Sequence, residues 1–461
     1  MPAAALLLFL LGTPAIGDGA MSLGAAQRES LIKTFDDQYD ETNAGWGAGH
    51  KYVDAAAIEW SLATLDAGNQ PALRKVRHTL DANLNLIDPV WGGVYQYSDR
   101  ADWKSPHYEK LLSFQADDLR LYSDAYARWQ RQSDLEAARK IYGYLTKFLA
   151  APDGGFYVSQ DADVSTRVAG REFYSKSDAA RRAIGMPRID VQEYSRETGW
   201  AIRALCKYYD VTGDVTALSR AEQAARWARS ARGVPGGGFR HARDEEAHAG
   251  GGPFLNDNVS MTQAFLALYR STGEREWLHY SVAALDFIDA RLRDSRGGYM
   301  VAPEGSAGRG VFHEPVRDVA QNAALARVAN MIHHYTGTDR PRNVARHAMK
   351  FLSTPATADS GQFRPEILLA DHELSVAPIH ITVVGAKDDS AAQALHAAAL
   401  RYPSDYLQVD WWDRREGKLP DPAITYPVLG HPAAFACTAN ACSTPIYDAS
   451  RLIDRVRGVL D

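Results

Sequence analysis

Six short Gly-aromatic turns recur along the chain, and they constrain its fold more than any other feature. Successive turns lie roughly 45 to 80 residues apart, which is typical of a repeat architecture. Glycine allows the positive φ that a tight turn needs, and the aromatic side chain can hold the loop against nearby helix ends. The turns are Gly45-Trp46-Gly47, Gly92-Gly93-Val94-Tyr95, Gly154-Gly155-Phe156-Tyr157, Gly236-Gly237-Gly238-Phe239, Gly297-Gly298-Tyr299 and Gly361-Gln362-Phe363.

The segments between the turns carry apolar residues at i, i+3, i+4 and i+7, and each is long enough for two amphipathic helices. One example is residues 108–131 followed by residues 135–149. Thr-Gly-acidic sequences at 212–214 and 272–274 end one helix and begin the next, with glycine as a left-handed C-cap and an acidic residue at the new N-terminus. Each repeat is therefore predicted to be a helical hairpin followed by a glycine-rich loop.

The six hairpins are predicted to close into a ring. An open solenoid is the alternative, but it needs polar capping repeats, and the sequence contains none. We therefore expect an all-α, six-hairpin (α/α)6 toroid over residues 28–370. Over residues 371–461 the pattern changes to β-branched strands at 379–385 and 406–412 around a helix, which predicts a small α/β appendage packed on the toroid.

The charge pattern argues against a nucleic-acid partner. The net charge is -6, and no run of Lys or Arg could neutralise a row of phosphates. Ten Trp and 22 Tyr, many beside glycine in loops, either stack on the apolar face of a ligand or pack the helices. Gly385 is a lone glycine after its strand and is too weak a signal for nucleotide binding, so no cofactor is expected.

The two ends of the chain bear on its compartment. The apolar run at 3–11, followed by small residues, is too short for a membrane span of about 20 residues and is typical of a signal peptide over residues 1–20. This predicts a periplasmic or secreted protein, with a cytoplasmic one as the alternative. Cys437 and Cys442 lack further ligands for zinc, so no metal site is expected. They form either a local disulfide, which would suit export, or two reduced packing cysteines.

Residues 97–112 read YSDRADWKSPHYEKLL and closely resemble a signature of the spermatogenesis-associated, thioredoxin-like family. Residues 154–163 (GGFYVSQDAD), 254–278 and 432–445 resemble further segments of that family in the same order. The resemblance implies a six-hairpin toroid similar to N-acylglucosamine 2-epimerases and six-hairpin glycosidases. The family's thioredoxin-like domain has no counterpart in the residues before 35, so a separate thioredoxin-like protein is a candidate partner.

Loops that enter the inner helices of such a toroid surround a central funnel, and their charged residues are the natural site candidates. Glu109 suits either a helix N-terminus or catalysis, and His107 titrates near neutrality. Asp161 and Asp163 are turn formers, a Ca²⁺ ligand pair or an acid/base pair. Asp257 is a helix cap or a site carboxylate. The predicted catalytic residues are His107, Glu109, Asp161, Asp163 and Asp257, and the predicted substrate-binding residues are Trp103, Lys110, Tyr157, His313, Arg317 and Asn322.

These candidates favour a carbohydrate-active enzyme that hydrolyses a glycosidic bond with two carboxyl groups from different loops of the funnel. Sugar epimerisation or isomerisation with His107 and His313 as proton-transfer groups is the nearest alternative. The others are a non-catalytic carbohydrate-binding protein and a scaffold for the thioredoxin-like partner. All but the scaffold require a small-molecule or oligosaccharide ligand. The catalytic candidates are expected to converge on one funnel, because a closed ring brings corresponding loops together.

Overall fold

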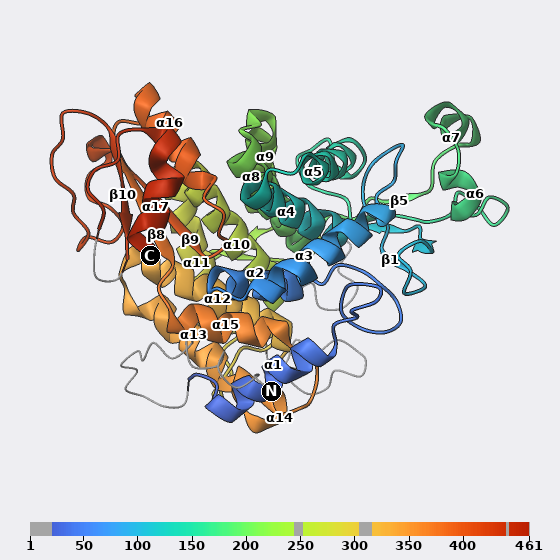
Figure 1. Ribbon diagram of the computed structural model, residues 1–461, viewed down its shortest axis with the longest axis horizontal. Helices are drawn as coiled ribbons and strands as arrows, with labels where there is room; N and C mark the ends of the chain where they lie inside the picture. The colour runs from blue at the N-terminus through green and yellow to red at the C-terminus, as the bar shows by residue number, and fades with distance from the viewer. Residues whose placement is uncertain (1–20, 244–251, 304–315, 439–441, 461) are drawn as a thin grey trace.

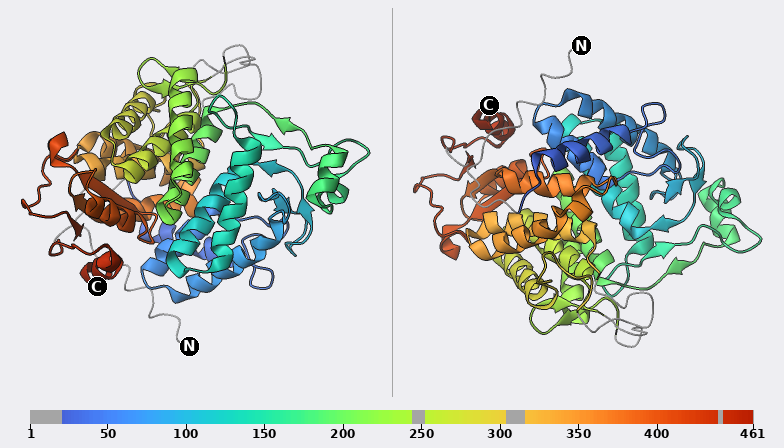
Figure 2. Two further views of the ribbon diagram at one scale, coloured as in Figure 1. Left: turned by 90° about the horizontal axis from the view of Figure 1, so that it is seen from above. Right: turned by 90° about the horizontal axis from the view of Figure 1, so that it is seen from below.

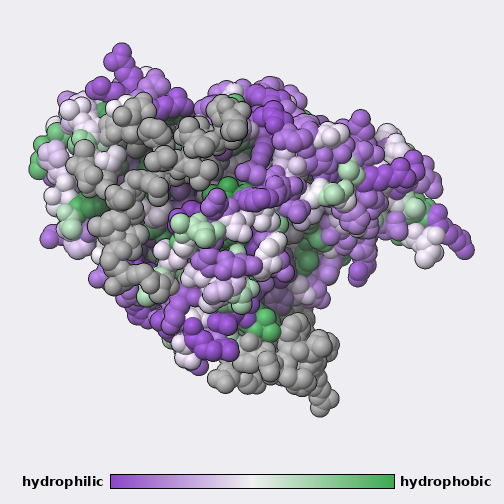
Figure 3. Space-filling view, turned by 60° about the horizontal axis from the view of Figure 1, so that its bottom comes forward, coloured by the Kyte–Doolittle hydropathy of each residue, from purple (hydrophilic) through white to green (hydrophobic). Residues whose placement is uncertain are grey.

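A computed structural model describes residues 21–243, 252–303, 316–438 and 442–460 (Figure 1). The predicted signal peptide at 1–20 and the predicted site residue His313 lie outside the described residues. No helix in the described ranges has the length and apolarity needed to cross a membrane. The face of the molecule in Figure 3 is mostly hydrophilic wherever its residues are described, with only small scattered hydrophobic spots.

Within the described residues, six inner helices form a closed ring (Figure 2). Neighbours in the ring are consecutive inner helices of the chain, and the last one returns to pack on the first. The closed toroid predicted from the repeats is thereby confirmed over the open solenoid. The inner helices are α2 (Ala55–Asp66), α4 (Leu112–Trp129), α8 (Ser195–Thr212), α10 (Leu255–Thr272), α12 (Val319–Thr336) and α15 (Pro365–Ser375).

Each inner helix has an outer partner, and the last hairpin joins the two ends of the toroid sequence. Outer helix α1 comes first in the chain but packs on α15, the last inner helix. Its Arg28 donates to the buried Asp371 of α15 at 2.8 Å, and Leu31 and Phe35 enter the core. Closure therefore depends on a contact between residues about 340 positions apart. The outer helices are α1 (Ala25–Asp37), α3 (Gln70–Asn83), α5 (Gln132–Tyr144), α9 (Val215–Ala231), α11 (Arg275–Arg291) and α13 (Asp339–Leu352).

Buried amide side chains tie three of the Gly-aromatic turns to the ring. Asn322 is the fourth residue of α12, and its amide exchanges two hydrogen bonds with the backbone of Tyr299, at 2.7 and 3.0 Å. Asn258 holds Phe239 in the same way from α10, at 2.8 and 3.1 Å. Gln115 holds Val94 from α4, at 2.6 and 2.7 Å. Each amide replaces a missing backbone partner in the loop and so fixes the loop on the N-terminal turn of an inner helix.

Glycine is required where these turns pass close to an outer helix. Gly93 has φ of +76°, and a Cβ there would lie 2.5 Å from the ring of Tyr144. Gly298 has φ of +78°, and its Cβ would lie 2.6 Å from Phe351. A side chain at either position would meet both backbone strain and a clash.

The described parts of the loops before the inner helices lie at one end of the ring, while connections of two or three residues occupy the other end. An arm containing α6 and α7 projects from the long-loop end (Figures 1 and 2). Short antiparallel pairings organise this end: β1 with β2, β6 with β7, and the sheet β3–β4–β5. These elements are β1 (Tyr97–Ser98), β2 (Pro106–His107), β3 (Lys110–Leu111), β4 (Ser159–Gln160), α6 (Gly170–Tyr174), α7 (Asp178–Ile184), β5 (Ile189–Asp190), β6 (Gly233–Val234) and β7 (Gly238–Phe239).

The appendage has a separate core and covers the short-connection end of the ring. Its sheet has the order β10–β8–β9, with β8 and β9 parallel around α16 and β10 antiparallel to β8. Tyr269 of α10 donates to Asp410 of β9 at 2.9 Å, and the backbone N–H of Val409 donates to Tyr335 of α12 at 3.1 Å. The predicted α/β appendage is confirmed. Its elements are β8 (Ile379–Val384), α16 (Ser390–Leu400), β9 (Leu407–Trp412), β10 (Ala433–Cys437) and α17 (Leu452–Leu460).

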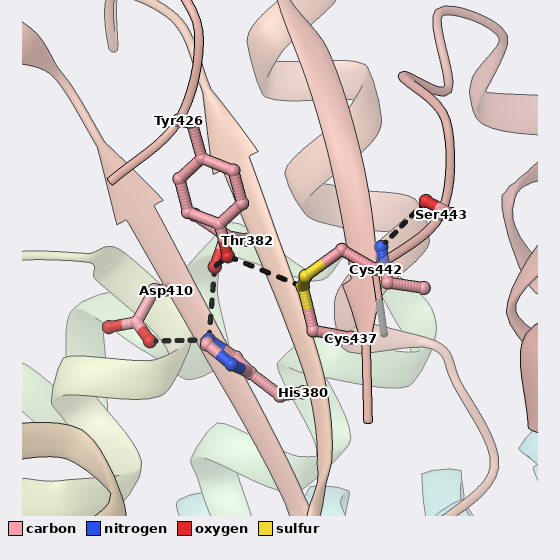
Figure 4. Close-up of a disulfide and its surroundings, with 8 residues drawn as sticks. His380, Thr382, Asp410, Tyr426, Cys437, Cys442 and Ser443 are labelled. Carbon is pink, nitrogen blue, oxygen red and sulfur yellow. Dashed lines mark hydrogen bonds and ion pairs between the residues drawn. A yellow bond between two sulfur atoms is a disulfide. The ribbon is translucent and has the colours of Figure 1, made fainter. Parts of the chain in front are cut away.

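Cys437 and Cys442 form a disulfide at the end of β10 (Figure 4). Tyr426 lies against it, with its hydroxyl 3.6 Å from the Sγ of Cys437, and donates to Thr382 at 2.8 Å. Cys206 is a buried free thiol in α8. The remaining short elements are η1 (Leu84–Leu86), η2 (Leu145–Leu149), α14 (Pro355–Ala358), η3 (Arg414–Glu416) and η4 (Ala449–Arg451).

Candidate active site

Charged side chains replace apolar ones on the faces of the inner helices that surround the central space, which we call the lumen. On α4, Asp117, Arg120 and Asp124 follow one another at intervals of three or four residues, which places them on one side of the helix. Arg203 and Lys207 do the same on α8. None of these lining residues was among the predicted site residues, although charged residues at helical spacing within apolar helices are a signal that could have identified them.

Glu59 of α2 is the centre of a buried ion-pair cluster. It forms an ion pair with Arg120, accepts from Arg327 of α12 at 2.7 Å, and lies 4.0 Å from Arg203. Burial opposes the charge of Glu59, but Arg120 and Arg327 outweigh it and lower its pKa to about 2. Arg327 also donates twice to Glu373 of α15, at 3.0 and 2.7 Å. Charges this deep are retained only when they are paired, so the cluster links five of the inner helices.

The appendage closes the inner end of the lumen with a carboxylate, and we call this end the floor. Asp405 precedes β9 and lies 3.4 Å from Lys207 and 3.6 Å from Arg120. Burial opposes its charge, yet Lys207 and Arg120 hold the pKa of Asp405 well below its usual range. The neighbouring Tyr406 donates to the backbone oxygen of Glu373 at 2.6 Å. The floor is therefore built by both parts of the molecule.

Three carboxyl groups occupy the opposite end of the lumen, which we call the mouth: Asp54 caps α2, Glu366 is the second residue of α15, and Asp117 lies in the second turn of α4. Burial raises the pKa of Glu366 to about 7, and repulsion from Asp54 and Asp318 adds to the effect. Burial also raises the pKa of Asp117 and of Asp54, which repel each other. Half of the Asp117 side chain is nevertheless accessible to solvent. A carboxyl group that titrates near neutrality among other carboxyls is typical of acid/base sites.

Aromatic side chains accompany these carboxyl groups. A cavity of about 330 Å³ is lined by Asp54 and Asp117 together with Tyr52 and Phe114, whose rings lie 5.9 Å apart in an edge contact. Partly exposed rings beside carboxyl groups suit the apolar faces and hydroxyl groups of a sugar. In the part of the chain that the structure describes, no cluster of His, Cys, Asp and Glu is arranged to hold a metal ion.

The predicted site residues between positions 103 and 110 are divided between the surface and the core. His107 stacks on Tyr97 with ring centres 4.9 Å apart and lies 3.7 Å from Glu109, and both side chains are partly exposed. Lys110 is fully buried and donates to Asp88 at 2.9 Å, beneath the rings of three tyrosines. Trp103 is also buried, and its indole donates to the backbone oxygen of Asn43 at 2.7 Å.

The other predicted carboxylates each have a local partner. Asp161 pairs with Arg188 at 3.0 Å, and Asp163 accepts from the backbone N–H of Gly170 at 2.6 Å. Asp257 accepts from the backbone N–H of Arg196 at 2.9 Å. The sheet β3–β4–β5 brings the loops of Glu109 and Asp161 side by side. Among the described residues, no hydrogen bond or ion pair joins these carboxylates to one another, and their catalytic roles stay predictions.

Two of the remaining predicted substrate-binding residues contact the backbone of the Gly-aromatic turn at 297–299. Arg317 donates to the backbone oxygen of Gly297 at 2.8 Å and stacks on Phe351 at 4.5 Å. Asn322 is the buried amide that holds Tyr299. Tyr157 is partly buried against the core. A binding role for these side chains also stays a prediction.

One histidine at the long-loop end was not singled out in the sequence. His241 lies 3.0 Å through Nδ1 from Asp257 of α10 and stacks on Tyr194, with ring centres 4.0 Å apart. A quarter of its side chain is exposed. A carboxylate on one ring nitrogen orients the imidazole and leaves the other nitrogen for proton transfer. His241 lies in a loop and Asp257 in a helix, 16 positions apart, so no local sequence pattern predicts that they pair.

Comparisons with known proteins confirm the resemblance to the spermatogenesis-associated proteins. No family model matches the chain. The chain is 30% identical over 156 residues to spermatogenesis-associated protein 20 of Mus musculus and 29% identical over 156 residues to that of Homo sapiens. Each alignment covers 32% of this chain and 20% of the relative, so the matched region is about a fifth of the curated relatives' length.

Solved structures share the fold over a larger part of the chain. A D-mannose isomerase has a TM-score of 0.59 at 12% identity, covering 78% of this chain and 99% of that one. The cellobiose 2-epimerase of Bacillus thermoamylovorans B4167 has a TM-score of 0.57 at 11% identity, covering 71% of this chain and 86% of that one. A sugar epimerase from a ruminal bacterium has a TM-score of 0.54 at 15% identity, covering 71% and 85%. The chain therefore has the six-hairpin toroid fold of these enzymes.

Proposed function

We propose that the protein is a carbohydrate-active enzyme that hydrolyses a glycosidic bond at the mouth of the lumen. The observation that carries this proposal is Glu366, a carboxyl group whose pKa burial and the neighbouring Asp54 raise to about 7, while Asp54 in turn lines a cavity together with Asp117. Glycoside hydrolysis needs one protonated and one ionised carboxyl group on either side of the scissile bond. The likeness in fold to sugar epimerases and a mannose isomerase supports a sugar ligand.

Glu366 is assigned as the general acid, because a group with a pKa of about 7 is substantially protonated at neutral pH and can protonate the leaving oxygen. Asp117 is assigned as the ionised partner that activates water. Its side chain is half exposed, and Arg120 at 3.4 Å opposes the rise that burial causes in its pKa. Asp54 is less suited to this role, because its side chain caps α2 by accepting from the N–H of Ala57 at 2.9 Å.

A panel of 4-nitrophenyl glycosides tests the assignment. Glu366→Gln should reduce kcat/KM on the best substrate by roughly 100-fold or more, since general acid catalysis contributes about that much. Wild-type activity should fall as pH rises through about 7, because the acid then loses its proton. Glu172→Gln, an exposed carboxylate on the projecting arm, is the matched control and should leave activity unchanged. Hydrolysis that survives Glu366→Gln at full rate would refute the proposal.

Epimerisation or isomerisation is the second candidate, and the pair of His241 and Asp257 favours it as a positioned proton-transfer group. Incubating reducing sugars with the protein in D2O distinguishes the two. Deuterium appearing at C2 by NMR, and disappearing with His241→Asn, would establish epimerisation or isomerisation. Free products of glycoside cleavage without such exchange would establish hydrolysis.

We also propose that the protein is exported and that it binds a separate thioredoxin-like partner. Export to the periplasm or outside the cell is supported by the Cys437–Cys442 disulfide, since disulfides persist in oxidising compartments. A separate thioredoxin-like partner is supported by the resemblance to the spermatogenesis-associated family. Co-purification of such a protein from the native host tests the second point.

A further inference from the structure

The floor of the lumen is rich in cationic side chains. A cavity of about 100 Å³ lies there, and the charged groups that line it are Arg120, Arg203, Lys207, Arg270 and Arg327, with Glu373 and Asp405. This volume exceeds that of a single water and can take a group of a few heavy atoms. A ligand can bind only to those cations whose N–H groups are not already hydrogen-bonded to carboxylates.

Three of these cationic side chains already form hydrogen bonds with carboxylates. Lys207 donates to Asp124 at 2.9 Å. Arg270 donates to Asp210 at 2.9 Å. Arg327 is held by Glu373 and Glu59, as described above. Their charges are balanced locally, so they shape the cavity rather than offer a vacant donor.

Arg203 is different. Among the described residues, the one carboxylate within 4.0 Å of it is Glu59, which is beyond hydrogen-bond distance, and the two oxygens of Glu59 already face Arg120 and Arg327. The Arg203 side chain is 29% exposed to the lumen. Its guanidinium therefore has donors directed at a space that a ligand can reach.

Arg120 adds a second vacant donor. Its side chain is only 5% exposed, yet Nη1 has no hydrogen-bond partner among the described residues. Oδ2 of Asp405 lies 3.6 Å from this nitrogen and is itself without a hydrogen bond to the described residues. A buried guanidinium nitrogen without an acceptor is unfavourable, so an acceptor that fills the cavity is favoured.

We infer that the floor is an anion-binding subsite in which Arg203 and Arg120 hold the carboxylate of an acidic sugar. The inference rests on the proposed function and names its substrate class as a hexuronate. The mouth carries the carboxyl groups of Asp117 and Asp54, whose ionised forms repel an anion. The acidic end of the substrate therefore points to the floor, and its glycosidic bond lies at the mouth beside the proposed acid.

Calorimetric titration with D-glucuronate and D-glucose, which differ at C6 only, tests the subsite. Wild type should bind glucuronate at least about tenfold more tightly than glucose, which is typical of a charge-assisted bidentate contact. Arg203→Met should abolish this preference, and Arg203→Lys should keep part of it because the charge remains. Arg226→Met, on the outer surface of α9, is the matched control and should keep the full preference.

Equal affinity of wild type for the two sugars would overturn the inference, as would a preference that survives Arg203→Met. If Arg203→Met does not fold, as judged by circular dichroism, the titration of Arg203→Lys decides: an unreduced preference overturns the inference. The proposed function fails separately, because it falls if Glu366→Gln retains turnover. Glu366→Gln should keep the preference for glucuronate in either case.

Discussion

Replacing Asn322 by alanine tests how the Gly-aromatic turns are held on the ring. The buried amide accepts from the N–H of Tyr299 at 2.7 Å and donates to the backbone oxygens of Tyr299 at 3.0 Å and Asp318 at 2.8 Å. Alanine removes these three bonds and leaves a buried N–H without an acceptor. A buried polar group that loses its partner costs about 1–3 kcal/mol, and a carbonyl costs less than an N–H. We therefore expect a loss of about 2–5 kcal/mol in the free energy of unfolding.

Urea unfolding, with the m-value compared between variants, measures this loss. The control is Asn85→Ala, because that exposed amide makes a single bond to the backbone oxygen of Ala82 at 2.9 Å and should cost less than about 0.5 kcal/mol. Asn322→Asp should destabilise at least as much as alanine, since a carboxylate oxygen would face two backbone oxygens. A cost for Asn322→Ala no larger than that for Asn85→Ala would refute the role of the amide.

The other predictions concern ionisation, a buried cation and the disulfide. The pKa of Glu366 is raised from 4.5 to about 7, so the folded state binds the proton more tightly and wild type should lose up to about 3 kcal/mol between pH 5 and 8. Glu366→Gln should lack this loss in urea unfolding, and parallel pH curves for the two proteins would contradict the assignment. Lys110→Met should cost about 1–3 kcal/mol, because Asp88 loses a buried donor, and should leave sugar affinity unchanged in calorimetry. Weaker sugar binding without lost stability would instead make Lys110 a ligand contact. Reducing the Cys437–Cys442 disulfide should cost about 2 kcal/mol, because the loop it closes is short. An unchanged unfolding midpoint in dithiothreitol would argue against that value.

Local patterns in the sequence were sufficient for the hairpins, the turns and the appendage. Helical periodicity depends on residues three or four positions apart, and a turn depends on glycine at one or two positions. Gly298 illustrates this, because its positive φ and its closeness to Phe351 explain why glycine is needed there. The parallel strands 379–384 and 407–412 were equally readable as β-branched and aromatic runs.

The candidate site depended on contacts that no local pattern contains. Glu366 has its raised pKa because the ring buries it beside Asp54, a residue about 310 positions earlier. Asp405 reaches Arg120 and Lys207 only because the appendage folds over the end of the ring. The predicted Lys110 looked like a funnel residue from its motif, but its side chain is buried with Asp88.

The sequence of this protein was thus enough to define its repeats and its fold class, because both follow from short-range periodicity and backbone preference. Only the tertiary structure decided which charges share the lumen. Burial and electrostatic coupling act through space, so they depend on how the ring closes and not on spacing along the chain.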